Sequence, residues 1–107
     1  METPHEWLIV KIGEKDPFYK VFATWRGGYL GGDSWRMNSG ITKVEESDTT
    51  YDFYGESGSC YSCNKNGYGS SSYTQGVLNN IIEKAKEVNT VVEIMDTDTD
   101  WVELFDK

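Results

Sequence analysis

The stretch WLIVKIGEKDPFYKVFATWR, residues 7–26, decides the fold because it contains two strand signals separated by a turn signal. Trp7 to Ile12 is a short apolar run with β-branched residues, which is typical of a buried strand. Gly13 to Pro17 carries the residues of a turn. Phe18 to Arg26 alternates between apolar and polar side chains, as a strand with one buried face does. The stretch therefore predicts an antiparallel hairpin at the start of the domain.

Further short strands are predicted outside this hairpin, and Gly, Ser, Asn or Asp residues separate them. Three lie in the middle of the chain in the pattern of an antiparallel meander, and one lies near its end: Ile41 to Glu46, Thr50 to Tyr54, Ser59 to Lys65 and Thr90 to Met95. Gln75 to Val88 instead carries one apolar stripe at helical spacing. We expect this helix to pack across the sheet.

The end of the chain predicts a short helical turn. Asp100, followed three residues later by Glu103, resembles a capping box. Trp101, Leu104 and Phe105 would then share one face and anchor the tail on the core.

These signals predict one α+β domain over residues 1–107. It consists of an antiparallel β-sheet of five to six strands, one main α-helix packed on one face, and a short C-terminal helical turn. A chain of 107 residues can bury one modest core. Because the chain has four Trp, seven Tyr and four Phe, that core should be aromatic.

The formal net charge of −8 produces a field that repels nucleic acid and anionic membrane. We therefore expect no direct DNA or RNA binding. The charge is uneven: Pro17 to Val44 has a local balance of +3, from Lys20, Arg26, Arg36 and Lys43 against Asp33, so the remaining residues sum to −11. Acidic clusters lie at Glu45-Glu46-Asp48 and from Asp96 to Asp106. Each is predicted either to form a solvated face or to fit a basic cleft on a partner protein.

Two Trp-Arg dipeptides, Trp25-Arg26 and Trp35-Arg36, flank the glycine-rich residues 27–32. A stacking ring beside a guanidinium that can hold phosphate is the chemistry of a nucleotide site. Asn38 adds a short polar group nearby. The alternative is that these tryptophans belong to the core.

A polar loop over Asn66 to Tyr73 ends where the predicted helix begins, so hydroxyls, flexible amides and the positive end of a helix dipole come together. These features suit a phosphate. The alternative is a plain polar loop in which Ser72 or Thr74 caps the helix. The candidate ligand-binding residues are Arg26 and Arg36 to neutralise phosphate, Trp35 and Tyr68 to stack on bases, Lys65, Ser70 and Ser71 to close the phosphate site, and Asn38 beside them.

No catalytic chemistry and no cofactor is predicted. The only histidine, His5, lies near the N-terminus, and nothing marks two of the eighteen acidic residues as a catalytic pair. Asp96, Asp98 and Asp100 resemble the start of a calcium loop, but Trp101 and Lys107 stand where that loop requires Gly and Glu. We therefore expect a binding protein rather than an enzyme, without a metal site.

Cysteine usage and the N-terminal residues favour the cytoplasm. Cys60 and Cys63 cannot form a four-ligand zinc site with one histidine, and positions three apart on a strand face opposite ways. We expect both thiols to stay reduced. Met1 to Glu6 lacks the basic and apolar regions of a signal peptide, and we expect no membrane partner.

The residues from Ser34 to Ile41, from Gly58 to Lys65 and at Tyr68-Gly69 resemble a group of small uncharacterised bacteriophage proteins. The resemblance implies a setting in the host cytoplasm, where such proteins counter host immunity. Some sequester cyclic nucleotide signals and others block a defence protein.

Two functions are therefore expected. The first is a non-catalytic sponge that sequesters a small phosphorylated ligand, such as a cyclic oligonucleotide immune signal. We expect this sponge to be a homo-oligomer, because so small an aromatic-rich domain has surface to cover. The alternative is an acidic protein inhibitor of a host defence complex, of the anti-CRISPR or DNA-mimic type.

Overall fold

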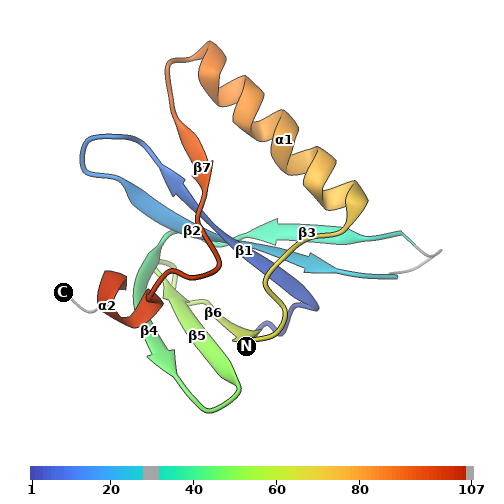
Figure 1. Ribbon diagram of the computed structural model, residues 1–107, viewed down its shortest axis with the longest axis vertical. Helices are drawn as coiled ribbons and strands as arrows, with labels where there is room; N and C mark the ends of the chain where they lie inside the picture. Colours follow the sequence, from blue (N-terminus) through green and yellow to red (C-terminus); the bar gives the residue numbers. More distant parts are fainter. Residues whose placement is uncertain (28–31, 106–107) are drawn as a thin grey trace.

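The chain folds into two stacked antiparallel sheets with a helix on one side (Figure 1). The computed structural model describes residues 1–27 and 32–105. In chain order these residues form β1 (Glu6–Ile12), β2 (Phe18–Trp25), β3 (Ser34–Met37), β4 (Ile41–Glu46), β5 (Thr50–Gly55), β6 (Cys60–Asn64), α1 (Ser72–Glu87), β7 (Val92–Ile94) and α2 (Trp101–Phe105). One sheet has the order β3-β2-β1-β7 and the other β4-β5-β6.

The four-stranded sheet is the middle layer. On one face, Leu8, Val10 and Phe22 pack with Leu78 of α1. On the other face, Trp7, Ile9, Val21 and Ala23 pack with Phe53, Tyr61 and Cys63 of the three-stranded sheet and with Trp101 of α2. The predicted hairpin is confirmed, since β1 and β2 pair antiparallel over their whole length.

The prediction of a single sheet of five to six strands was wrong. The described residues form two sheets with seven strands in total, because the meander β4-β5-β6 forms a sheet of its own. Residues 7–10 are apolar without alternation, and all four are buried. A strand of this kind presents apolar side chains on both faces. Because α1 covers only one of these faces, the apolar face of the meander covers the other.

Strand β3 is an element that the sequence analysis did not assign, since Ser34–Met37 was interpreted only as part of a ligand site. It pairs antiparallel with β2 and is the edge of the middle sheet. Of the glycine-rich residues 27–32 before it, residues 28–31 lie outside the described residues.

The predicted helix is confirmed with a shifted start. Its N-cap is Ser71, not Ser72 or Thr74. Thr74 occupies the third position of a capping box, in which each side chain bonds the other residue's backbone amide. The Thr74 hydroxyl also accepts a buried hydrogen bond from Thr24 (2.9 Å), which ties the start of α1 to β2.

The C-terminal turn is also confirmed. The Glu103 amide donates to Asp100 Oδ1 at 3.1 Å, and Trp101 is 2% exposed. Leu104 and Phe105 pack against the same core, and α2 lies beside β4 (Figure 1). Among the helices of the described residues, none has the length and apolar character needed to cross a membrane.

Candidate binding surfaces

The two Trp-Arg dipeptides are divided between the faces of the middle sheet. The register places Trp35 opposite Thr24 and Arg36 opposite Ala23. Directly opposite residues share a face, so Trp35 lies on the α1 face and Arg36 on the face toward the three-stranded sheet. Trp35 stacks on Phe22 with ring centroids 5.5 Å apart and is 40% exposed.

Arg26 lies on the α1 face, and its guanidinium forms an ion pair within this chain. Its Nε donates to Glu6 Oε1 at 2.7 Å, and Glu6 pairs with Thr24 in the register. Arg26 and Arg36 therefore lie on opposite faces of the sheet. Arg36 itself is 3.7 Å from a Glu2 carboxylate oxygen and is largely exposed.

The start of α1 has a carboxylate of this chain beside it. Asp33 Oδ1 accepts from the Gly27 amide at 3.1 Å. The pKa of the Asp33 carboxyl is lowered, first by the Ser71 hydroxyl and then by the Gly27 amide. Because a helix N-terminus favours a negative charge, Asp33 occupies the position where the sequence analysis expected a phosphate.

The serines of the predicted phosphate loop take part in helix capping. Ser71 is 5% exposed and caps α1, while Ser70 donates to Gln75 Oε1 at 2.7 Å.

The side chains of Lys65 and Tyr68 each interact with residues outside the predicted ligand site. Lys65 forms an ion pair with Glu46 at 2.5 Å and lies over the Tyr51 ring. The Tyr68 hydroxyl donates to the Met95 carbonyl at 2.6 Å and accepts from the Ile9 amide at 3.2 Å. Burial raises the pKa of Tyr68 to about 12. Tyr68 thus joins β1 to the segment after β7.

Asn38 is the predicted site residue with a free buried donor. Its Oδ1 accepts from the Val21 amide at 2.9 Å, which settles the orientation of the side-chain amide. Nδ2 is buried without a hydrogen-bond partner. An unpaired buried donor of this kind costs about 1–3 kcal/mol.

A group of serine hydroxyls lies next to that donor. A Cβ on Gly55 would lie 2.9 Å from both Ser39 Oγ and Ser59 Oγ and 3.3 Å from Asn38 Nδ2. Ser39 donates to Ser57, and Ser57 donates to Ser59. Gly55 is therefore needed here for space, and polar side chains from the segments before β4 and before β6 converge over it.

The structure thus brings the eight predicted residues together only in part. Ser71 and, more weakly, Arg26 both lower the pKa of the Asp33 carboxyl, and Arg36 and Asn38 share a face two positions apart. Trp35, Lys65 and Tyr68 lie in separate surroundings. The sequence analysis missed Glu6 and Asp33. Glu6 lies on β1 beside Arg26, and Asp33 accepts from the Gly27 amide next to Arg26; both contacts form only when the strands pair.

Negative charge, by contrast, is concentrated in one part of the structure. We call residues 41–65 and 95–105, which form the three-stranded sheet, α2 and the segment before α2, the acidic half. It holds nine acidic residues against two lysines, a net charge of −7: Glu45, Glu46, Asp48, Asp52, Glu56, Asp96, Asp98, Asp100 and Glu103 against Lys43 and Lys65. The other described residues have eight acidic and seven basic side chains, a net charge of −1.

The outer face of the three-stranded sheet contains two carboxylates side by side. Glu45 pairs directly with Asp52 across β4 and β5. Asp52 accepts from Ser62 Oγ at 2.7 Å and Thr50 Oγ1 at 3.1 Å. Like charges directly opposite each other destabilise a sheet. Lys43 Nζ, 3.9 Å from Glu45 Oε1, and the two hydroxyl donors to Asp52 offset part of this repulsion.

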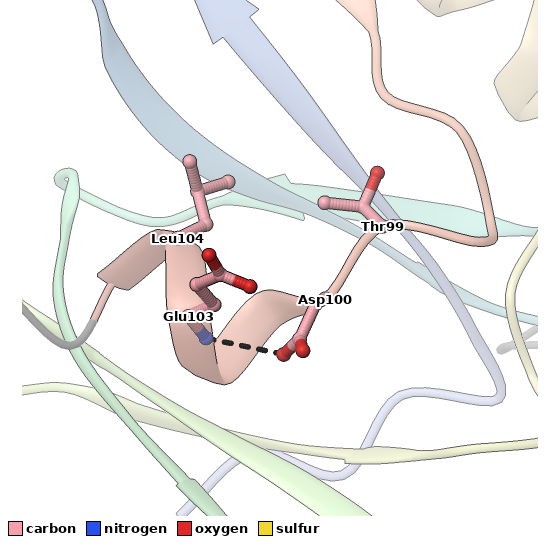
Figure 2. Close-up of a pocket in the computed structure, with 4 residues that line it drawn as sticks. All are labelled: Thr99, Asp100, Glu103 and Leu104. Atoms are coloured by element: carbon pink, nitrogen blue, oxygen red, sulfur yellow. Dashed lines mark hydrogen bonds between the residues drawn. The ribbon is translucent and has the colours of Figure 1, made fainter.

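A pocket of about 260 Å³ lies at α2 within the acidic half (Figure 2). It is lined by Thr99, Asp100, Glu103 and Leu104. Figure 2 shows the two carboxylates beside the hydrogen bond that caps α2. The pocket is smaller than the roughly 300–1,000 Å³ typical of drug-sized ligands, so its size suits a single side chain.

Within residues 1–27 and 32–105, no group of three or more His, Cys, Asp or Glu side chains is arranged to hold a metal ion. Cys60 and Cys63 are both free thiols. Comparisons with protein-family models, with curated proteins and with solved structures found no match to this chain.

Proposed function

We propose that this protein is a non-catalytic binding protein whose acidic half docks on a basic surface of a partner protein, in the manner of a nucleic-acid mimic. The observation that carries the proposal is the segregation of charge. A net charge of −7 out of −8 lies on the three-stranded sheet, α2 and the segment before α2. A predominantly negative surface of this kind steers an oppositely charged partner and speeds its association.

Two local features support the proposal. The Glu45–Asp52 pair sets two carboxylates directly opposite each other on an outer face, and a basic side chain from a partner would reduce the repulsion between them. The pocket at α2 has the size of one side chain and carries Asp100 and Glu103, so it suits an arginine or lysine. On the resemblance to phage proteins, the partner would be a host defence protein that normally binds nucleic acid.

The test compares two variants with equal net charge. Glu45→Gln, Asp52→Asn, Asp98→Asn and Glu103→Gln neutralise the acidic half, whereas Glu14→Gln, Asp16→Asn, Glu83→Gln and Glu87→Gln neutralise acids elsewhere. Binding of deca-arginine is followed by calorimetry and by NMR shift mapping. We expect affinity to fall about tenfold or more in the first variant and about threefold or less in the second. Equal losses would show that only net charge matters and would refute a dedicated face.

A second function, sequestration of a small phosphorylated ligand, is favoured by Asn38 and Arg36. The free buried Nδ2 of Asn38 needs an acceptor, and the exposed Arg36 guanidinium lies two positions away on the same face. Titration with inorganic phosphate and with a cyclic dinucleotide, followed on the Asn38 side-chain NMR signals, tests this function. A saturable shift that Arg36→Ala abolishes supports it, and unchanged signals rule it out.

A further inference from the structure

Strand β3 has a free edge. It is the last strand of the middle sheet, and no other element of the described residues pairs with its outer side. The Asn38 amide donates to the Val21 carbonyl at 3.2 Å. In an antiparallel ladder the bonded positions alternate, so residues 34, 36 and 38 direct their backbone groups toward β2.

The backbone groups of Trp35 and Met37 therefore face outward. A second bond supports this assignment: the Thr24 carbonyl accepts from the His5 amide at 3.0 Å, so the Thr24 backbone is directed toward β1 and away from β3. Trp35 is the residue opposite Thr24. The edge thus presents unpaired N–H and C=O groups at two alternate positions, together with a Trp35 ring that is 40% exposed.

We infer that β3 pairs antiparallel with β3 of a second copy, about a two-fold axis at Trp35, and so joins the two middle sheets into one continuous eight-stranded sheet. This inference goes beyond the proposed function, because it uses the edge of the middle sheet and not the acidic half.

The alternating direction of the backbone N–H and C=O groups and the charge of Arg36 together select the register of this pairing. Only registers that pair outward-facing positions with one another form hydrogen bonds, which leaves a two-fold axis at one of the residues of β3. Because β3 runs from Ser34 to Met37, an axis at Ser34 or Met37 would overlap the two strands only at that end residue. An axis at Arg36 would place two arginines directly opposite each other, which is destabilising. An axis at Trp35 pairs the two Trp35 residues and sets Arg36 opposite Ser34 of the second copy. The two rings then lie side by side on the α1 face, and aromatic pairs of this kind are favourable.

Charge also favours a second copy at this edge over other places on the molecule. The middle sheet and α1 belong to the part of the chain with a net charge of −1, whereas the acidic half carries −7. Two copies that meet through β3 therefore bring together their least charged parts. Pairing leaves both acidic halves available to partners.

Sedimentation velocity over a range of protein concentrations tests the inference. We expect reversible dimers, with a dissociation constant on the order of tens of micromolar because the contact is small. Raising the salt concentration should strengthen the dimer, since it screens the repulsion between two acidic chains.

Two variants and one control distinguish pairing through this edge from nonspecific association. Met37→Pro removes an outward N–H at a position where an edge strand tolerates proline, and Trp35→Ala removes the ring. Each should weaken the dimer at least about tenfold while far-UV circular dichroism stays unchanged. Phe18→Ala, which removes another exposed ring (49% exposed), should leave it unchanged. A protein that stays monomeric at every concentration, or a dimer that tolerates Met37→Pro, would overturn the inference.

Discussion

Trp101→Ala tests whether the C-terminal tail is part of the core. Trp101 is 2% exposed, and its ring centroid lies 6.0 Å from Trp7, 6.3 Å from Phe53 and 5.8 Å from Tyr68. A buried aromatic side chain hides roughly 150–250 Å², which at about 25 cal/mol/Å² corresponds to roughly 4–6 kcal/mol. Trp→Ala changes in protein cores cost about 3–5 kcal/mol, so we expect a loss in that range.

Urea unfolding followed by far-UV circular dichroism measures this loss at a protein concentration well below the dimer's dissociation constant, where the chain is monomeric and Trp35→Ala is the matched control. The same side chain is removed there, but Trp35 is already 40% exposed and lies at an edge. We expect the control to cost about 1–2 kcal/mol, since less area is lost and no closed cavity forms. A loss below about 1 kcal/mol for Trp101→Ala, or equal losses for both variants, would show that α2 is not anchored in the core.

Three further outcomes are expected. Ser71→Ala should cost about 1 kcal/mol in urea unfolding, because it removes the N-cap of α1; no loss would mean that the capping box is not formed in solution. Tyr68 has a pKa raised to about 12 from 10, so its contribution to stability is complete below pH 10 and is lost as pH rises toward 12. Tyr68→Phe should reduce the slope of the stability profile in that window, to which Tyr54 and Tyr61 also contribute through raised pKa values; an identical profile would contradict the buried environment. Burial raises the pKa of Cys63, which is fully buried, and of the partly exposed Cys60. A thiol reagent should therefore modify Cys60 first in the native protein, and Cys60→Ser should leave a chain that reacts only on unfolding.

Local pattern predicted most of the elements correctly. The alternation of residues 18–26, the helical stripe of α1 and the capping residues of α2 each depend on near neighbours in the chain, so they are readable from sequence. The missed strand, Ser34–Met37, is short and has only one β-branched or aromatic residue, Trp35. It becomes a strand because it pairs with the edge of β2. This pairing depends on the tertiary structure and not on the local sequence.

The candidate ligand site was predicted from residue types without knowledge of their faces. Arg26 and Arg36 are chemically suited to phosphate, but strand parity places them on opposite sides of the middle sheet. Their carboxylate partners, Glu6 and Glu2, come from another part of the chain. Sequence spacing alone does not report such pairs, because they form only when the sheets assemble.

The sequence by itself determined the total charge, the aromatic character of the core, the first hairpin and the main helix, since these depend on composition or on local periodicity. The tertiary structure alone decided how many sheets form and which layer carries the charge. The uninterrupted apolar run of residues 7–10 needs cover on two faces, and α1 supplies only one. The meander supplies the other with its apolar side and directs its acidic side to solvent, where α2 adds four more carboxylates from the segment that leads into it and from its first turn. Acidic residues far apart in the chain thereby come to lie on neighbouring elements, since α2 packs beside β4.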